Sequence, residues 1–114
     1  MKVTELMGQA IDAGASDLHL NPGRPPVARV DGRLVSLGTD EVTDEKAQAW
    51  CRDLCDEVHW EELERMGTTD IGLAHETGNR FRVSCMKQRG RYTAILRLIP
   101  VSYTHLTLPT ILLV

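Results

Sequence analysis

The sequence predicts an α+β domain in which an antiparallel sheet of about six strands carries helices on one face. The chain has 114 residues, of which 42% are hydrophobic and 25% charged, as expected for one small globular domain. Apolar and polar residues alternate in short segments in two separate parts of the chain, which is the pattern of half-buried strands. Tight turn signals join these segments, so consecutive strands are expected to pair antiparallel.

The first third of the chain predicts one helix followed by three strands. Apolar side chains recur at helical spacing from Val3 to Ile11, and Gly14 suits the helix end. The segment SDLHL alternates as a strand does, whereas NPGRPP is a loop because its prolines fix φ and lack an N–H. In VARVDGRLVSL, Asp31 and Gly32 tolerate the positive φ angles of a two-residue hairpin turn.

The rest of the chain predicts helices and then three more strands. From Thr43 an apolar stripe has helical spacing, continues on a second helical stretch and ends at Gly67; it comprises Ala47, Trp50, Cys51, Leu54, Cys55, Val58, Leu63 and Met66. Three strands are then expected in TDIGLAHE, RFRVSCMKQ and RYTAILRLI, with turns at TGN and at Gly90.

Residues 101–114 differ from the rest because VSYTHLTLPTILLV contains no Lys, Arg, Asp or Glu. Its apolar residues would fit a terminal strand, which Pro109 would restrict to a sheet edge. However, Val101 to Thr110 match one reading frame of a transposase-based sequencing-library adapter, and ILLV fits the index and stop codon that follow. We therefore expect residues 1–100 to form the domain and residues 101–114 to be a non-native, adapter-derived tail.

Composition indicates the cellular compartment of the chain and disfavours some classes of ligand. Glu5 and Gln9 interrupt the start of the chain where a signal peptide needs an apolar run. No segment reaches the roughly 20 apolar residues of a membrane span, and three cysteines without a secretory signal indicate reduced thiols. These features predict a cytoplasmic chain, and the net charge of −3 gives no overall attraction to nucleic acid.

Charge is distributed unevenly along the chain. Residues 40–64 carry ten acids against two basic residues, whereas residues 77–100 carry six basic residues and no acid. In the last two predicted strands, alternate positions place Arg80, Arg82, Arg91 and Arg97 on one face. This arginine-rich face is either a solvated sheet surface or an anion site, since guanidinium groups bind phosphate oxygens bidentately. The lack of acids in residues 77–100 favours the anion site.

The cysteines and histidines give weaker indications of a functional site than the arginines do. Cys51, Cys55 and His59 lie at i, i+4 and i+8, so one helix could present three zinc ligands; the same cysteines also fit an apolar core. His19 is expected at a surface or an interface. The sequence shows no catalytic triad order, no H-E-x-x-H and no G-x-x-x-x-G-K-[ST] loop. We therefore predict that this chain is not an enzyme and holds no metal or cofactor of its own.

Several short motifs occur in the order found in one protein family. They are GASDLHL at residues 14–20, PP followed by RVDGRL within residues 25–34, TD at 69–70, and RFRVS with LRLIP within residues 80–100. Together they resemble the N-terminal domain of the type II/type IV secretion ATPases, with the closest likeness to the PilT-like pilus-retraction ATPases. The resemblance covers residues 3–100. The segment CMKQRGR departs from it in being more basic and less aromatic.

The resemblance implies a PAS-like domain that precedes a RecA-like ATPase domain in a cytoplasmic homo-hexamer serving twitching motility. In that family, arginines of the N-terminal domain reach the phosphates of nucleotide held by the RecA-like domain. By position in the motifs these are Arg82 and Arg97, with Arg29 a weaker candidate. The parent protein would use ATP and Mg²⁺ and act on the pilus platform at the inner membrane. This chain would be its regulatory or oligomerisation domain, inactive alone.

Two alternatives belong to other functional classes. A stand-alone PAS-like module would bind a small ligand or a partner in an apolar pocket. Nucleic-acid binding through the basic hairpin is disfavoured by the net acidity and by the low aromatic content of 4%.

Overall fold

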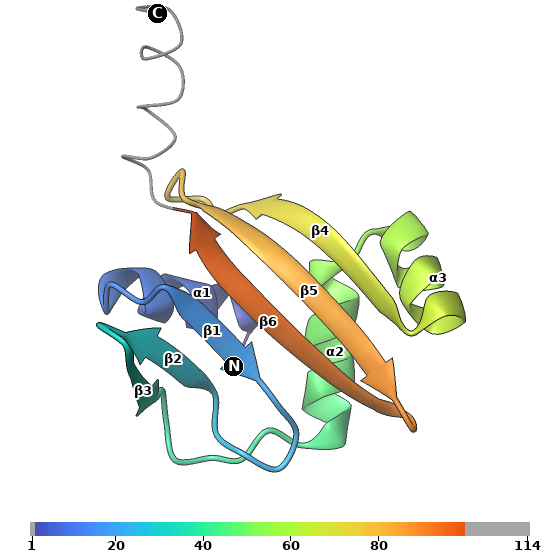
Figure 1. The fold of residues 1–114 in the computed structure, drawn as a ribbon, viewed down its shortest axis with the longest axis horizontal. Coiled ribbons are helices and arrows are strands. Elements are labelled where there is room, and N and C mark those ends of the chain that lie inside the picture. Colours follow the sequence, from blue (N-terminus) through green and yellow to red (C-terminus); the bar gives the residue numbers. More distant parts are fainter. Residues whose placement is uncertain (1, 100–114) are drawn as a thin grey trace, which may run out of the picture.

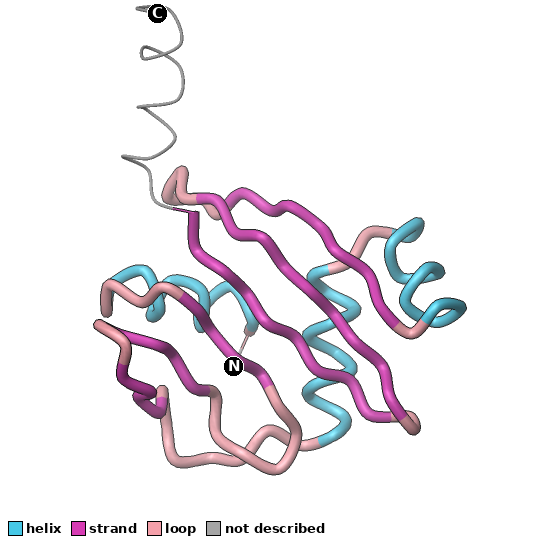
Figure 2. Tube along the Cα trace, in the orientation of Figure 1, coloured by secondary structure: helices cyan, strands magenta, loops and turns pink. Residues whose placement is uncertain are grey.

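A computed structural model describes residues 2–99, so the predicted tail at 101–114 lies outside the described residues. Figure 1 shows a twisted sheet with its helices behind it, and Figure 2 separates helices from strands by colour. The elements in chain order are α1 (Val3–Asp12), β1 (Asp17–Leu20), β2 (Val27–Val30), β3 (Arg33–Ser36), α2 (Asp44–Leu54), α3 (Glu57–Met66), β4 (Thr68–Ala74), β5 (Arg80–Gln88) and β6 (Arg91–Ile99). The predicted α+β fold with an antiparallel sheet is confirmed.

The sheet consists of two three-stranded units joined along one seam. Its strand order is β3-β2-β1-β6-β5-β4, and every neighbouring pair is antiparallel. β1–β2–β3 and β4–β5–β6 each connect neighbours in sequence, whereas β1 and β6 pair across nearly the whole chain. The first and last described strands therefore meet in the middle of the sheet.

One face of the sheet is covered by the helices and forms the core. In β5 and β6 the predicted alternation is observed, because Phe81, Val83 and Leu96 are all at most 1% exposed. Leu6 of α1 and Leu63 of α3 are buried in the same cluster. Each fully buried side chain of this size contributes about 1.5–3 kcal/mol through removal of apolar surface from water.

The predicted apolar stripe through residues 47–66 is wrong at Val58 and Met66, whereas Leu63 is buried as predicted. The backbone leaves the helix at Cys55, with φ −95° and ψ 143°, and α3 begins anew with Asp56 accepting a hydrogen bond from the backbone N–H of His59 at 2.8 Å. This break changes the rotational phase of the helix, so Val58 and Met66 are 72% and 64% exposed.

Two tight turns have the same backbone conformation but different residues. Asp31 and Gly32, between β2 and β3, have φ of 51° and 79°; Arg89 and Gly90, between β5 and β6, have φ of 53° and 78°. Aspartate tolerates this left-handed region, whereas a long side chain without local hydrogen bonding is strained there. The first turn was predicted from its residues, and the second only from Gly90.

Aromatic and ionic contacts attach α3 to the sheet. Trp60 stacks on Tyr92 of β6 with ring centroids 5.5 Å apart. Glu64 accepts hydrogen bonds from the Lys87 ammonium and the Tyr92 hydroxyl. These bonds, with that of Lys87 the larger cause, hold the pKa of Glu64 below its ordinary value.

None of the helices within residues 2–99 has the length and apolar character needed to cross a membrane.

Candidate functional site

The three arginines singled out in the sequence lie in one row across the open face of the sheet. Arg82 of β5 is opposite Arg97 of β6, which is opposite Asp17 of β1, which is opposite Arg29 of β2. Gly72 of β4 and Leu34 of β3 complete the row at its two ends. Residues directly opposite in antiparallel strands share a face, with Cβ atoms about 4.5–5.5 Å apart. Six strands therefore contribute one residue each to a row that carries three guanidinium groups. We call it the arginine row, and it consists of Leu34, Arg29, Asp17, Arg97, Arg82 and Gly72.

Asp17 is the acid of this row. Its Oδ2 lies 3.3 Å from Arg29 Nε, and its Oδ1 lies 3.7 Å from Arg97 Nε. The Asp17 side chain is 18% exposed, whereas those of Arg29 and Arg97 are 43% and 73% exposed. The expectation that this face lacks a nearby acid, drawn from residues 77–100 alone, is therefore wrong. The acid comes from a strand that the arginine-rich segment pairs with, not from that segment itself.

Arg82 differs from the other two arginines of the row. Its side chain is exposed and has no ion-pair or hydrogen-bond partner within residues 2–99. Arg80, two residues earlier on β5, faces the same way and is also exposed. Arg82 is thus the unpaired guanidinium of the row.

The next row along the open face is largely uncharged. Ser84 of β5 donates a hydrogen bond to Asp70 Oδ1 of β4 at 2.5 Å and lies opposite Ile95 of β6, which lies opposite His19 of β1. His19 Nε2 is 3.9 Å from Asp17 Oδ2 and makes no hydrogen bond among the described residues. His19 is therefore part of the open face, partly buried beside Asp17.

A second basic region lies at the far end of the same face. An open hollow of about 950 Å³ is bordered by the β1–β2 loop and the β5–β6 turn, and its lining includes Arg24, Arg89 and Arg91. Arg91 Nε lies 3.7 Å from Asp44 Oδ1 at the start of α2. Sequence reasoning missed Arg24 here, because only the pairing of β1 with β6 brings its loop to the β5–β6 turn.

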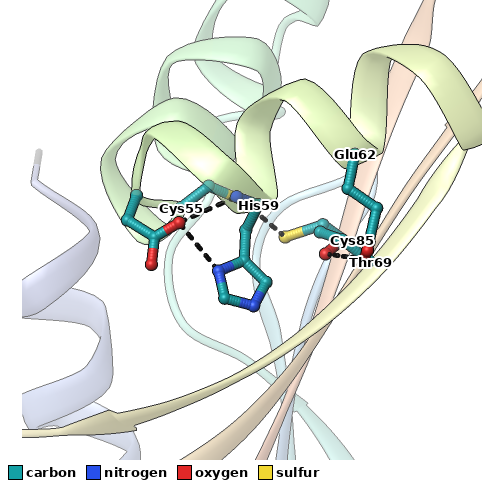
Figure 3. Close-up of polar contacts among 6 residues, drawn as sticks. Cys55, His59, Glu62, Thr69 and Cys85 are labelled. Carbon is teal, nitrogen blue, oxygen red and sulfur yellow. Dashed lines mark hydrogen bonds and ion pairs between the residues drawn. The ribbon is translucent and has the colours of Figure 1, made fainter.

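The three candidate zinc ligands do not form one helical face. Cys51 lies in α2, Cys55 follows the end of that helix, and His59 lies in α3. Both cysteines are buried, and Cys55 Sγ lies 4.0 Å from Cys85 Sγ of β5 (Figure 3). Burial raises the pKa of Cys55 to about 12. These thiols are core groups, and the raised pKa keeps Cys55 protonated at neutral pH. No set of three ligating side chains within residues 2–99 could hold a metal ion.

His59 takes part in capping α3 instead. Its Nδ1 lies 2.7 Å from Asp56 Oδ1, the oxygen that also caps the helix. The hydrogen bonds from His59, chiefly that of its backbone N–H, lower the pKa of Asp56. Farther along the same helix, Glu62 accepts a hydrogen bond from Thr69 of β4 at 2.6 Å (Figure 3).

His75 is a buried polar residue whose role the sequence did not reveal. His75 Nε2 lies 3.2 Å from the Thr4 carbonyl oxygen of α1, and His75 Nδ1 lies 3.0 Å from Thr77 Oγ1 and 3.3 Å from the Thr77 backbone nitrogen. The predicted strand TDIGLAHE ends at Ala74, and His75 begins the turn into β5, in which its carbonyl accepts a hydrogen bond from the Gly78 N–H. The residue ties that turn to the start of α1.

In sequence, the chain is similar to ATPases of type IV pili. The type IV pilus retraction ATPase PilT of Pseudomonas aeruginosa is 32% identical over 100 residues, which are 88% of this chain and 29% of that protein. The type IV pilus ATPase PilU of the same organism is 25% identical over 115 residues, covering 98% of this chain and 30% of PilU. No protein-family model matches the chain.

In structure, the chain matches the crystal structure of the pilus retraction motor PilT with bound ADP. The TM-score is 0.80 at 35% sequence identity, over 89% of this chain and 30% of that one. The Legionella pneumophila ATPase DotB shares the fold, with a TM-score of 0.72 at 20% identity over 86% of this chain and 28% of that one.

Sequence and fold thus agree that the chain is similar to part of the PilT ATPases. The chain spans about 30% of the length of the relatives it matches.

Proposed function

We propose that residues 1–100 are the N-terminal domain of a pilus-retraction ATPase, and that their open sheet face contacts nucleotide phosphates bound by a RecA-like domain. The observation that carries the proposal is the cross-strand row, in which Arg82 and Arg97 lie side by side at paired positions of β5 and β6. Two adjacent exposed guanidinium groups suit a multiply charged phosphate, because each can donate two hydrogen bonds to phosphate oxygens.

The role of these arginines in the proposal is electrostatic. Arg82 and Arg97 donate to phosphate oxygens and offset negative charge that develops in phosphoryl transfer, as an arginine finger does. The phosphates and Mg²⁺ are positioned by the RecA-like domain of the same or a neighbouring subunit, so this chain alone has no ATPase activity. Arg29, at the other side of Asp17, contributes positive charge to the face without an assigned contact.

The wider biological role follows from similarity to PilT. In this proposal the domain regulates and helps to assemble a homo-hexamer that works in the cytoplasm against the pilus platform of the inner membrane. Domain closure onto bound ATP would then be coupled to force on the pilus through the arginine row.

ATP turnover of the longer protein that contains the RecA-like domain tests the proposal. Arg82→Gln and Arg97→Gln should each lower turnover at least tenfold, a threshold set well below the roughly 10³–10⁵ attributed to an arginine finger. Arg80→Gln is the matched control, because Arg80 has the same charge, strand and face but lies outside the row. Circular dichroism should show all three variants folded. Unchanged turnover in the Arg82 and Arg97 variants, or an equal loss in the control, would contradict the proposal.

A further inference from the structure

The charge balance of the arginine row depends on one residue, Asp17. It is the single acid among the six row positions, and it lies between two of the three arginines. Each of its carboxylate oxygens faces a different arginine, Oδ2 toward Arg29 and Oδ1 toward Arg97. Asp17 therefore reduces the formal charge of the row from three positive charges to two.

The Asp17 side chain is more buried than those of the two arginines it faces. All three residues lie on internal strands of the sheet, β1, β2 and β6, so the difference lies in the side chains and not in the pairing of the backbone. The Asp17 side chain is 18% exposed, against 73% for Arg97. The distance of 3.7 Å between Arg97 Nε and Asp17 Oδ1 makes this a loose ion pair rather than a close hydrogen bond. The arginine is the more exposed partner and the carboxylate the more buried one.

We propose that Asp17 is a built-in counter-charge that weakens phosphate binding to the isolated face by competing for Arg97. A phosphate that reaches Arg82 meets a free guanidinium, but it shares Arg97 with Asp17. The face then binds phosphate well only when a second surface adds its own contacts. Asp17 thereby makes phosphate recognition depend on domain closure, and it acts through Arg97 as a positioning residue.

The inference rests on the proposed function in taking phosphate as the anion, but it is tested on the 114-residue chain with inorganic pyrophosphate as the probe. Isothermal titration at low ionic strength should show Asp17→Asn binding pyrophosphate about three- to fivefold more tightly than the wild type, the range expected for removal of one exposed ion-pair competitor. The gain should shrink as salt is added, because exposed charges are screened.

Two further variants separate a specific counter-charge from a general change of charge. Asp70→Asn removes one negative charge from the same face, but Asp70 contacts Ser84 and no arginine; it should change the affinity much less. In Asp17→Asn/Arg97→Gln the tightening should disappear, because the arginine set free is no longer present. Asp17→Glu should restore weak binding.

The pyrophosphate affinities test the inference without any measurement of ATP turnover. No tightening in Asp17→Asn, weaker binding, tightening equal to that of Asp70→Asn, or tightening that survives Arg97→Gln would each overturn it. If Asp17 had only a structural role, Asp17→Asn would lower the melting temperature without raising the affinity for pyrophosphate. That result would also overturn the inference. If pyrophosphate tightening depends on Arg97 while Arg82→Gln and Arg97→Gln leave ATP turnover of the longer protein unchanged, the counter-charge stands and the proposed function fails.

Discussion

The two faces of the β5–β6 hairpin use alternate residues of the same strands for different purposes. On the covered face, Phe81, Val83 and Leu96 are buried against the helices. On the open face, Arg82 and Arg97 lie at positions next to them in sequence and are exposed. Because side chains of a strand alternate strictly, one backbone can carry a core and a charged surface without compromise between them. Changes on one face should therefore leave the properties of the other nearly intact.

The largest effect is expected from truncation on the covered face. Phe81→Ala removes a fully buried ring and leaves a cavity, so the free energy of unfolding should fall by about 3–5 kcal/mol. Arg82→Ala, one residue away on the open face, should change it by no more than about 0.5 kcal/mol. Urea denaturation followed by circular dichroism measures both. Similar losses in the two variants would mean that the faces are not independent.

A smaller effect on stability is expected when the pH is lowered, because Glu64 connects α3 to the sheet. The pKa of Glu64 is lowered in the folded chain, so its contribution to stability is present above its ordinary value of 4.5 and is lost as pH falls through the lower folded value. The melting temperature of the wild type should therefore drop more between pH 7 and about pH 3 than that of Glu64→Gln. Glu61→Gln, an exposed change on the same helix, should leave the wild-type slope unchanged. Equal slopes for the wild type and Glu64→Gln would exclude this contact as a source of acid sensitivity.

The smallest effect is expected at the turn where the two faces end. Arg89 adopts φ of 53° in a conformation that asparagine tolerates better. Arg89→Asn should therefore raise the free energy of unfolding by about 0.5 kcal/mol, through relief of left-handed strain. The reciprocal change Asp31→Arg, in the turn of matching backbone, should lower it by a similar amount. Chemical denaturation of both variants checks the pair, and a stability loss in Arg89→Asn would show that Arg89 makes a stabilising contact.

Much of the fold followed from local patterns in the sequence. Alternation in residues 80–88 and 91–99 predicted which side chains are buried, because burial on a sheet repeats every second residue. The Asp31–Gly32 turn was predicted because few residue pairs tolerate two consecutive positive φ angles. The phase of α3 was not predictable from spacing, since the break at Cys55 depends on capping by Asp56.

The candidate site was predicted in part. The alternation placed Arg82 and Arg97 on one face, and a family resemblance added Arg29. Asp17 was missed because nothing local connects it with arginines 12 and 80 residues later in the chain. Only the strand order β2-β1-β6-β5 brings the four together, and that order is a property of the whole sheet. Similarly, His75 looked like a strand residue because its partner, the Thr4 carbonyl, lies at the other end of the chain.

The seam between β1 and β6 has a consequence for the time course of folding. Each three-stranded unit closes through short loops, whereas the seam must close a loop of nearly the whole domain, which makes it the high-contact-order step. The Asp17–Arg97 ion pair spans this seam and can form only when the two units have joined. During synthesis on the ribosome, β1 remains without its second neighbour until β6 has emerged. The arginine row is thus complete only when the two units have joined across this seam.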